Sequence, residues 1–459
     1  LAQAADESVP LLERLRFLTI VSSNLDEFFE IRVAGLKEQI KLGLPEPGPD
    51  GRGPAEVFAE VSREAHAMVG DQYRLLNEVV LPALASDGIV FPRREQWSPA
   101  QRQWIRDYFF RELLPVLTPI GLDPAHPFPR VFNKSLNFAI ELEGRDAFGR
   151  KSRAAIVQAP RALPRVIRLP VDVAGAPYGF VFLSSILHAH MDELFSGMEV
   201  KGCHQFRVTR NSDLWVDEEE VDNLLQALKG ELSSRKFGEA VRLEVSDTCM
   251  SEMAQFLLQN VGLSADDLYR VNGPVNLGRM TAIYTLVERT DLKFPPFVPG
   301  TQPKLKASSD LFEVIRGEDL LLHHPYESFA PVVQLLAQAA EDPTVLAIKM
   351  TLYRTDAGSP IVTALLDAAR AGKEVTVVVE LRARFDEATN IDLATRHVAD
   401  PDLDQAPDLR DPIHHIAHDR RVRPLETLIC VAQVGMCIDM EDPDLAVNLG
   451  SALDRTERH

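Results

Sequence analysis

Two arginines and three nearby acids are the side chains of this sequence best suited to chemistry on anions. Arg354 and Arg384 each follow an apolar stretch rich in β-branched residues. A guanidinium group presents parallel N–H donors, so each arginine can hold two oxygens of one anion, and a phosphate chain suits a pair better than a carboxylate does. The alternative is that both arginines form ion pairs with Asp386, Glu387 or Glu380.

The two apolar stretches must be neighbouring strands if the arginines are to meet. Residues 344–354 and 374–381 have strand patterns, and an amphipathic helix is predicted between them at 361–371. Ser359 is placed to cap this helix and Gly372 to end it. These signals predict a β-α-β unit with parallel strands. Because ligands bind at the carboxyl ends of parallel strands, we expect both arginines in one crevice.

Charge and composition limit the partners of the protein. The 459 residues carry a formal net charge of −19, with 45% hydrophobic and 25% charged residues. This is a globular composition, and the acidic balance argues against nucleic acid as a partner, because phosphate backbones require basic surfaces. The acidic net charge is still compatible with one basic pocket, because the local charge of a pocket determines which ligand it captures.

The expected location is the reducing interior of a cell. Four cysteines are scattered without a C-x-x-C pair, which indicates free thiols rather than a disulfide framework. No apolar run approaches the length of a membrane span, and no signal peptide is visible. The chain begins at Leu1 inside a predicted helix, so we expect the native N-terminus to lie upstream.

Changes in the pattern of apolar, polar and turn-forming residues divide the chain into four predicted parts. Residues 1–95 have long helical patterns, and residues 96–300 mix strand and helix patterns and end in a proline-rich linker. Residues 301–391 contain the β-α-β unit. Residues 392–459 form a tail of different character. Within the first part, the stretch 22–36 predicts on composition alone a helix with a solvated face, which would carry the following polar residues: Asn24, Asp26, Glu27, Glu30 and Arg32.

Familiar nucleotide and hydrolase motifs are missing from the sequence. It contains no G-x-x-x-x-G-K-[ST] loop, no G-x-G-x-x-G after a strand, no H-E-x-x-H and no G-x-S-x-G. If the protein uses ATP, it does so without these loops. His323 and His324 form a pair, but paired histidines without nearby ligands are a weak metal signal.

Long motifs in a fixed order resemble the large, histidine-phosphorylating polyphosphate kinases. They include PLLERLRFLTIVSSNLDEFFEIRVAGL, LPVLTPIGLDPAHPFP, FRVTRNSDLWVDEEE, EDLLLHHPYESF and VLAIKMTLYRTDAGSPIVTALLDAARAGKEVTVVVELRARFDEATNI. The resemblance covers residues 1–391. It implies a multidomain protein with a helical N-terminal domain, an α+β head domain and an incomplete α/β phospholipase D-like C-terminal domain.

The resemblance also implies an activity and its residues. Members transfer the γ-phosphoryl group of ATP through a phosphohistidine to polyphosphate, with Mg²⁺ as cofactor. Asn24 matches the nucleotide-contacting asparagine, and Arg354 and Arg384 match the arginines of the magnesium–phosphate site. An arginine cannot ligate Mg²⁺, so this role must run through phosphate oxygens or water. ATP and polyphosphate are the implied partners of a cytoplasmic homo-oligomer, with peripheral membrane association as a further expectation.

The resemblance stops after Ile391. None of the 12 histidines has a lysine two residues later, so no catalytic histidine is identifiable from the family motif. His414 stands at about the expected distance from Arg384, but its flanks differ. The tail 392–459 has 14 acidic and 7 basic residues, a balance unfavourable for binding a polyanion.

Three functional hypotheses follow. The first is an ATP:polyphosphate phosphotransferase. The second is a non-catalytic remnant that binds nucleotide or polyphosphate, or assembles with intact subunits. The third is a phospholipase D-like hydrolase. The missing His-x-Lys motif argues against this hydrolase as much as it argues against the kinase. Because the resemblance to the family stops after Ile391, we also expect the sheet of the β-α-β unit to lack its later strands and to expose an edge.

Overall fold

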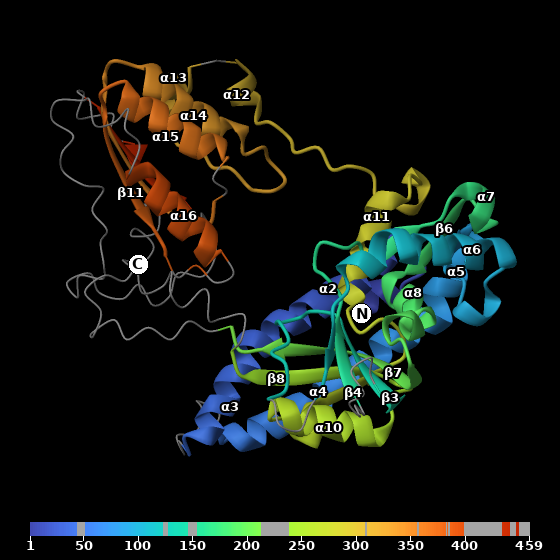
Figure 1. The fold of residues 1–459 in the computed structure, drawn as a ribbon. Coiled ribbons are helices and arrows are strands. Elements are labelled where there is room, and N and C mark those ends of the chain that lie inside the picture. The colour runs from blue at the N-terminus through green and yellow to red at the C-terminus, as the bar shows by residue number, and fades with distance from the viewer. Residues whose placement is uncertain are drawn as a thin grey trace. The chain divides into compact units, whose positions relative to one another are not determined.

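The computed structural model describes most of the chain. The described residues are 1–43, 51–122, 127–145, 154–212, 238–307, 310–355, 358–381, 383 and 386–398, together with the backbone of 434–440 and 447–448. They fall into two compact units, one ending at Pro295 and the other beginning at Pro296 (Figure 1). Each unit is described by itself.

Long helices at the start of the first unit confirm the helical patterns predicted there. The α-helices of this unit are α1 (Ala2–Ala5), α2 (Leu11–Phe28), α3 (Ala34–Lys41), α4 (Pro54–Leu75), α5 (Leu81–Ser86), α6 (Pro99–Tyr108), α7 (Val171–Ala174), α8 (Leu183–Ala189), α10 (Ser251–Val261) and α11 (Ala282–Leu286). A π-helical turn, η1 (Phe29–Val33), joins α2 to α3 without a break. Leu12, Leu15 and Leu18 are fully or almost fully buried at helical spacing, because they form the apolar face of α2.

A six-stranded sheet completes the first unit and confirms most of the strands predicted there. Its order is β2 (Pro119–Gly121), β4 (Ala154–Gln158), β3 (Asn137–Gly144), β7 (Met198–Arg210), β8 (Ala240–Ser246) and β9 (Leu268–Val271). Neighbouring strands are antiparallel except β8 and β9. A small separate sheet holds β1 (Ile89–Val90), β6 (Tyr178–Phe182) and β5 (Val166–Arg168). Within the part predicted to mix strands and helices, the sequence also has a helical pattern at 217–235, and those residues lie outside the described ones.

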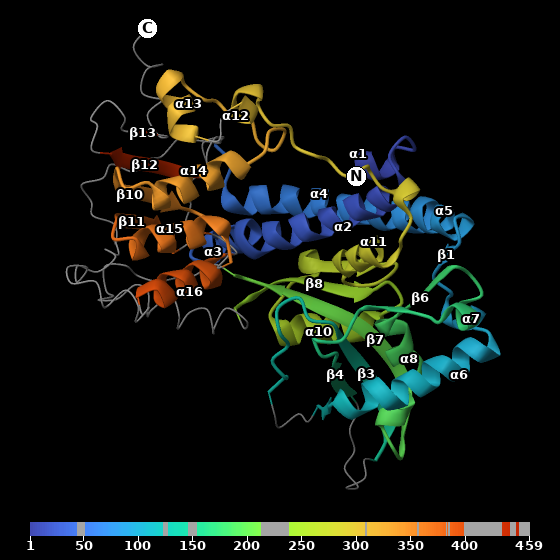
Figure 2. The ribbon, with the colours of Figure 1, turned by 90° about the horizontal axis from the view of Figure 1, so that it is seen from above.

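Strand alternation in β7 gives the sheet two different faces. Phe206 and Val208 belong to an apolar cluster with Leu257 of α10, whereas Arg207, between them, contacts Asp26 of α2. Successive side chains of a strand point to opposite faces, so the arginine is directed toward the N-terminal helices. Figure 2 shows α2 and α4 along one side of β8 and α10 on the other.

The second unit contains the predicted β-α-β unit. Strand β10 (Val345–Leu352) pairs in parallel with β11 (Glu374–Val379), and α15 (Pro360–Arg370) connects them. Ser359 Oγ accepts a hydrogen bond from the Ile361 amide at 3.3 Å, which confirms the predicted cap. The unit's other α-helices are α12 (Pro303–Ala307), α13 (Leu311–Gly317), α14 (Ala330–Glu341) and α16 (Glu387–Val398).

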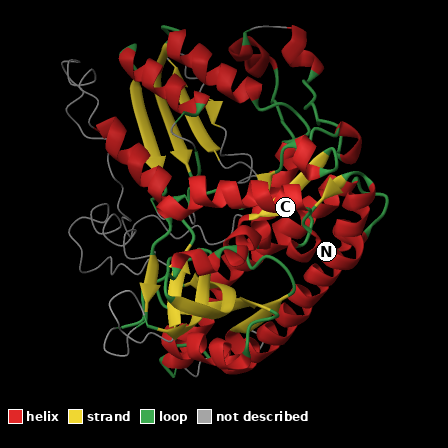
Figure 3. Cartoon of the chain, turned by 45° about the vertical axis from the view of Figure 1, so that its right-hand side comes forward, coloured by secondary structure: helices red, strands yellow, loops and turns green. Residues whose placement is uncertain are grey.

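The prediction that this sheet lacks later strands was wrong. Strand β12 (Val434–Met440), from the C-terminal tail, pairs antiparallel with β10, and β13 (Val447–Asn448) pairs with β12. The sheet therefore has the order β11-β10-β12-β13. Figure 3 draws the strands of the protein in yellow. The tail supplies the backbone donors and acceptors that the free edge of β10 would otherwise lack.

Among the described residues, no helix is both long enough and apolar enough to cross a membrane.

Candidate phosphate and nucleotide sites

Arg354 lies at the carboxyl end of β10, as predicted. It follows Leu352, the last residue of β10, which pairs in register with Val379 at the end of β11. The Arg354 side chain is 42% exposed, and its Nε lies 3.1 Å from Asp386 Oδ2. The ion pair considered as an alternative from the sequence is therefore present for Asp386. A pair this exposed is worth at most about 1 kcal/mol, so a multiply charged anion can displace the carboxylate.

Arg384, the second predicted arginine, lies outside the described residues. The described residues before and after it form two backbone hydrogen bonds. The Ala383 amide donates to the Glu380 carbonyl at 3.4 Å, and the Asp386 amide donates to the Ala383 carbonyl at 3.0 Å. Ala383 itself is fully buried. The shared crevice for both arginines remains a prediction.

The described side chains at this strand end suit a phosphate rather than a bare metal ion. In the described part of the chain, no group of three or more His, Cys, Asp or Glu side chains is placed to hold a metal. Arginine has only N–H donors and no lone pair for a cation. Mg²⁺ is commonly held by one or two carboxylates together with substrate phosphates, and Asp386 is one carboxylate at this position. The residues therefore fit a metal that arrives already bound to phosphate.

Asn24 occupies an exposed position on α2. Its neighbours Ser22 and Leu25 are buried, so the helix itself is fixed against the core while Asn24 points outward. No hydrogen bond to another described residue engages its amide. Asn24 and Arg354 belong to different units, and the proposed nucleotide contact of Asn24 remains a prediction.

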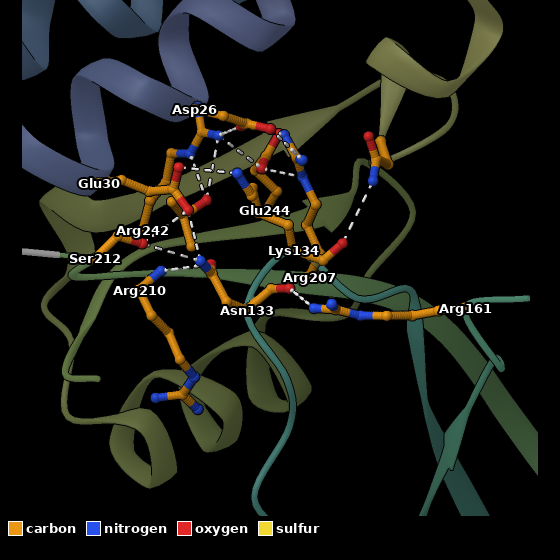
Figure 4. Close-up of polar contacts among 12 residues, drawn as sticks. Asp26, Glu30, Asn133, Lys134, Arg161, Arg207, Arg210, Ser212, Arg242 and Glu244 are labelled. Atoms are coloured by element: carbon orange, nitrogen blue, oxygen red, sulfur yellow. Dashed lines mark hydrogen bonds and ion pairs between the residues drawn. The ribbon is translucent and has the colours of Figure 1, made fainter. Parts of the chain in front are cut away.

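A network of buried charges lies two residues beyond Asn24 (Figure 4). Arg207 donates from Nη1 to Asp26 Oδ2 and from Nη2 to Asp26 Oδ1, both at 2.9 Å. Arg242 also pairs with Asp26, and its Nη2 lies 3.2 Å from Glu244 Oε2. Both arginine side chains are only 1% exposed. The network connects α2 to β7 and β8.

Opposite charges determine the ionisation of this network. Burial would raise the pKa of Asp26, but the charges of Arg207 and Arg242 outweigh it and lower that pKa. Burial would likewise lower the pKa of Arg207, but Asp26 and Glu244 raise it. Asp26 and Arg207 are therefore both charged at neutral pH, and the carboxylate compensates the guanidinium group directly.

Glu30 forms a second part of the same network. Its side chain, 2% exposed, accepts from Lys134 Nζ at 2.8 Å and from Ser212 Oγ at 3.1 Å. Asn133 also donates to it. Glu30 lies in the π-helical turn η1, and the Ser212 amide donates to its backbone carbonyl at 3.1 Å. This turn thus joins the helical segment to the end of β7.

The prediction of a solvated helix face was wrong for Asp26 and Glu30. Glu27 and Arg32 are exposed, as expected, but the other two acids are directed into the protein. A signal was present in the sequence. Arg207 and Arg242 each interrupt an apolar strand pattern, and a charged residue on a buried face requires a partner of opposite charge elsewhere in the chain.

Three family models match consecutive parts of the chain. The polyphosphate kinase N-terminal domain matches residues 1–92, the polyphosphate kinase middle domain matches residues 100–283, and the polyphosphate kinase C-terminal domain 1 matches residues 310–399. A polyphosphate kinase of Neisseria meningitidis serogroup C is 59% identical over 394 residues, which is 86% of this chain and 58% of that protein. One from Pseudomonas aeruginosa is 57% identical over 396 residues, covering 86% of this chain and 57% of that protein.

The fold has also been seen in a solved structure. The crystal structure of polyphosphate kinase from Porphyromonas gingivalis matches with a TM-score of 0.69 at 27% identity, over 86% of this chain and 55% of that one. Helices and sheets in several parts define a multidomain protein. The consecutive family models and the shared identity show that this chain belongs to the polyphosphate kinase family. It spans 54–58% of the length of the curated relatives it matches.

Proposed function

We propose that this protein acts as an ATP:polyphosphate phosphotransferase. The observation that carries the proposal is Arg354 at the carboxyl end of β10, beside β11, in a chain of the polyphosphate kinase family. Arg354 and Arg384 would hold phosphate oxygens, and Asn24 would contact the nucleotide. Charge on the transferring group builds up on its outer oxygens, which is where guanidinium groups stabilise it.

The proposed reaction has two transfers. In the first, the bond between the γ-phosphorus of ATP and its bridging oxygen breaks, a bond to a histidine nitrogen forms, and ADP leaves. In the second, a terminal oxygen of polyphosphate attacks the phosphorus and the histidine is released. A covalent carrier divides one difficult step into two easier ones. Mg²⁺ would neutralise phosphate charge, through phosphate or water rather than by direct ligation to the arginines.

The carrier histidine is not assigned. The family's His-x-Lys motif is absent from the sequence, and His414, the candidate by position, lies outside the described residues. The test is to incubate the purified chain with γ-labelled ATP and Mg²⁺ and to measure acid-labile, base-stable label. Label that disappears in His414→Ala would assign the carrier. Absence of label, together with no ATP-dependent chain growth by the complete protein of this locus, would overturn the proposed activity.

A second candidate function is binding without catalysis. The tail 392–459 has twice as many acidic as basic residues, and it contributes β12 to the sheet. Such a chain would bind nucleotide or polyphosphate, or assemble with intact subunits. Calorimetry with polyphosphate separates this function from an inert fragment: Arg384→Ala should weaken binding several-fold, by about 1 kcal/mol.

The remaining expectations are part of the proposal. The four-part division at residues 95, 300 and 391 is supported by the order of the matched domains, although the third match runs to residue 399. The phospholipase D-like character of the third part is supported only by the resemblance to the family. A cytoplasmic homo-oligomer, with peripheral membrane association, is supported only by the resemblance to the family. Size measurement by light scattering and fractionation of cells test these two expectations.

A further inference from the structure

A buried asparagine connects the carboxyl ends of both strands at the phosphate site. Asn390 lies in the first turn of α16 and is 1% exposed. Its Nδ2 donates to the Tyr353 carbonyl at 2.7 Å and to the Glu380 carbonyl at 2.8 Å. Both acceptors are carbonyl oxygens, which cannot donate, so the orientation of the amide is fixed by its partners.

The two carbonyls belong to the backbone that carries the arginines. Tyr353 directly precedes Arg354. Glu380 directly follows β11 and opens the segment that leads to Arg384. The Glu380 amide also donates to the Leu352 carbonyl at 3.1 Å, which extends the pairing of the two strands by one step. Asn390 therefore holds the ends of both strands, and on β10 it does so directly before Arg354.

A second contact fixes the far end of this segment. Arg354 Nε pairs with Asp386, which directly precedes α16, and the Asn390 amide donates to the Asp386 carbonyl at 2.9 Å. The chain from Glu380 to Asp386 is thus held at both ends by the same helix turn. Small displacements at such a point matter, because a charge 1 Å out of place loses much of its effect on a transferring group.

Only a primary amide of this length can make the two bonds from Nδ2. Asparagine has two N–H donors on one nitrogen, one for each carbonyl. Aspartate has nearly the same shape but would direct acceptor oxygens at acceptor carbonyls. Alanine removes the donors without adding charge, and leaves two carbonyls without this partner.

We propose that Asn390 is a positioning residue for the phosphate site at Arg354, which sets the distance between the ends of β10 and β11. This inference rests on the proposed function of Arg354. Asn390 does not touch the phosphate in this scheme. It acts through the backbone of Tyr353 and Glu380, so its loss should weaken binding of a phosphate chain more than the accompanying loss of stability explains.

The test combines calorimetry with inorganic tripolyphosphate and hydrogen exchange on the full chain. Asn390→Asp and Asn390→Ala are compared with Leu336→Ala, which removes a fully buried side chain of α14 and lowers stability without removing the hydrogen bonds of Asn390. The Asn390 variants should bind tripolyphosphate about tenfold more weakly, which corresponds to 1.4 kcal/mol. Peptides spanning 380–390 should exchange about tenfold faster only in the Asn390 variants, because local opening governs exchange.

The outcomes separate the inference from the proposed function. If the wild-type chain binds and the Asn390 variants lose no more affinity than Leu336→Ala, the positioning role is wrong while the phosphate site stands. If the wild-type chain does not bind tripolyphosphate, the proposed function fails. Hydrogen exchange then tests whether Asn390 holds the strand ends. An unchanged exchange rate over 380–390 in the Asn390 variants would overturn this role, and a local increase would support it.

Discussion

Arg207 and Asp26 form a two-point ion pair across 181 residues of sequence. The arginine is 1% exposed and the carboxylate 13%, so both charges are largely removed from water. Burying either charge without the other would cost several kcal/mol of stability, on the order of the penalty for an unpaired buried ion. Because the pair joins β7 to α2, it fixes the orientation of the helix on which Asn24 is exposed. The buried network thus links the stability of the first unit to the position of a proposed nucleotide contact.

Asp26→Asn should destabilise the protein strongly. The substitution keeps the shape of the side chain but removes its charge, which leaves Arg207 and Arg242 with less compensation. Breaking a buried pair costs about 3–5 kcal/mol, and we expect about 3 kcal/mol because Glu244 still pairs with both arginines. Urea unfolding at neutral pH measures this loss.

Glu27→Gln is the matched control for this substitution. Glu27 is the next residue of α2 and is exposed. Its replacement should change the free energy of unfolding by no more than about 0.5 kcal/mol. Equal effects of the two substitutions would show that the buried network contributes nothing specific.

The same network predicts how stability depends on pH. The charges of Arg207 and Arg242 outweigh the effect of burial and hold the pKa of Asp26 below the ordinary value of an aspartate. The unfolded chain therefore binds the proton more readily than the folded chain does. The contribution of Asp26 is complete above about pH 4, and it is lost as the pH falls through the lowered folded-state pKa.

The measurement is the stability difference between wild type and Asp26→Asn at several pH values. The difference should stay constant from neutral pH down to about pH 5 and should shrink below about pH 4, where the unfolded carboxyl takes up its proton. A difference that already shrinks between pH 7 and 5 would contradict the lowered pKa.

Asp386→Asn should increase the affinity of the second unit for phosphate chains. Asp386 pairs with Arg354 at 3.1 Å, and an incoming anion must compete with it. Asparagine keeps the preference for the position before a helix, so α16 should be unaffected. We expect about two- to fivefold tighter binding of tripolyphosphate by calorimetry, up to 1 kcal/mol. Weaker binding would instead indicate that the carboxylate itself helps to hold the ligand.

The two cysteines whose side chains are described should react slowly. Burial raises the pKa of Cys203 to about 12 and that of Cys249 to about 11. Thiolates are the reactive form, so alkylation at pH 8 should be at least about a hundredfold slower in the folded protein than in urea. Peptide mapping after iodoacetamide treatment measures each site. Equal rates in both conditions would show that the thiols are accessible.

Local signals in the sequence were enough to predict the β-α-β unit. Ser359 caps the connecting helix and Gly372 ends it with φ of 85°, a conformation that glycine adopts readily. Two apolar strands around such a helix have one stable arrangement, which places Arg354 at a carboxyl end. The family of the chain could be recognised for a similar reason, because long motifs keep their order. Whether Arg384 lies beside Arg354 stays a prediction.

The tertiary structure alone decided which charges are buried. Asp26, Glu27 and Glu30 are indistinguishable in a helical pattern, because solvent exposure depends on what packs against each face. Asp26 finds its partners about 180 and 216 residues later, on β7 and β8, and no local rule reaches that distance. Asn390 is a similar case, since its side-chain amide finds its two hydrogen-bond acceptors only when two strand ends meet beside it. The sequence by itself determined the elements and the arginine at a strand end, whereas only long-range packing determined the partners that hold them in place.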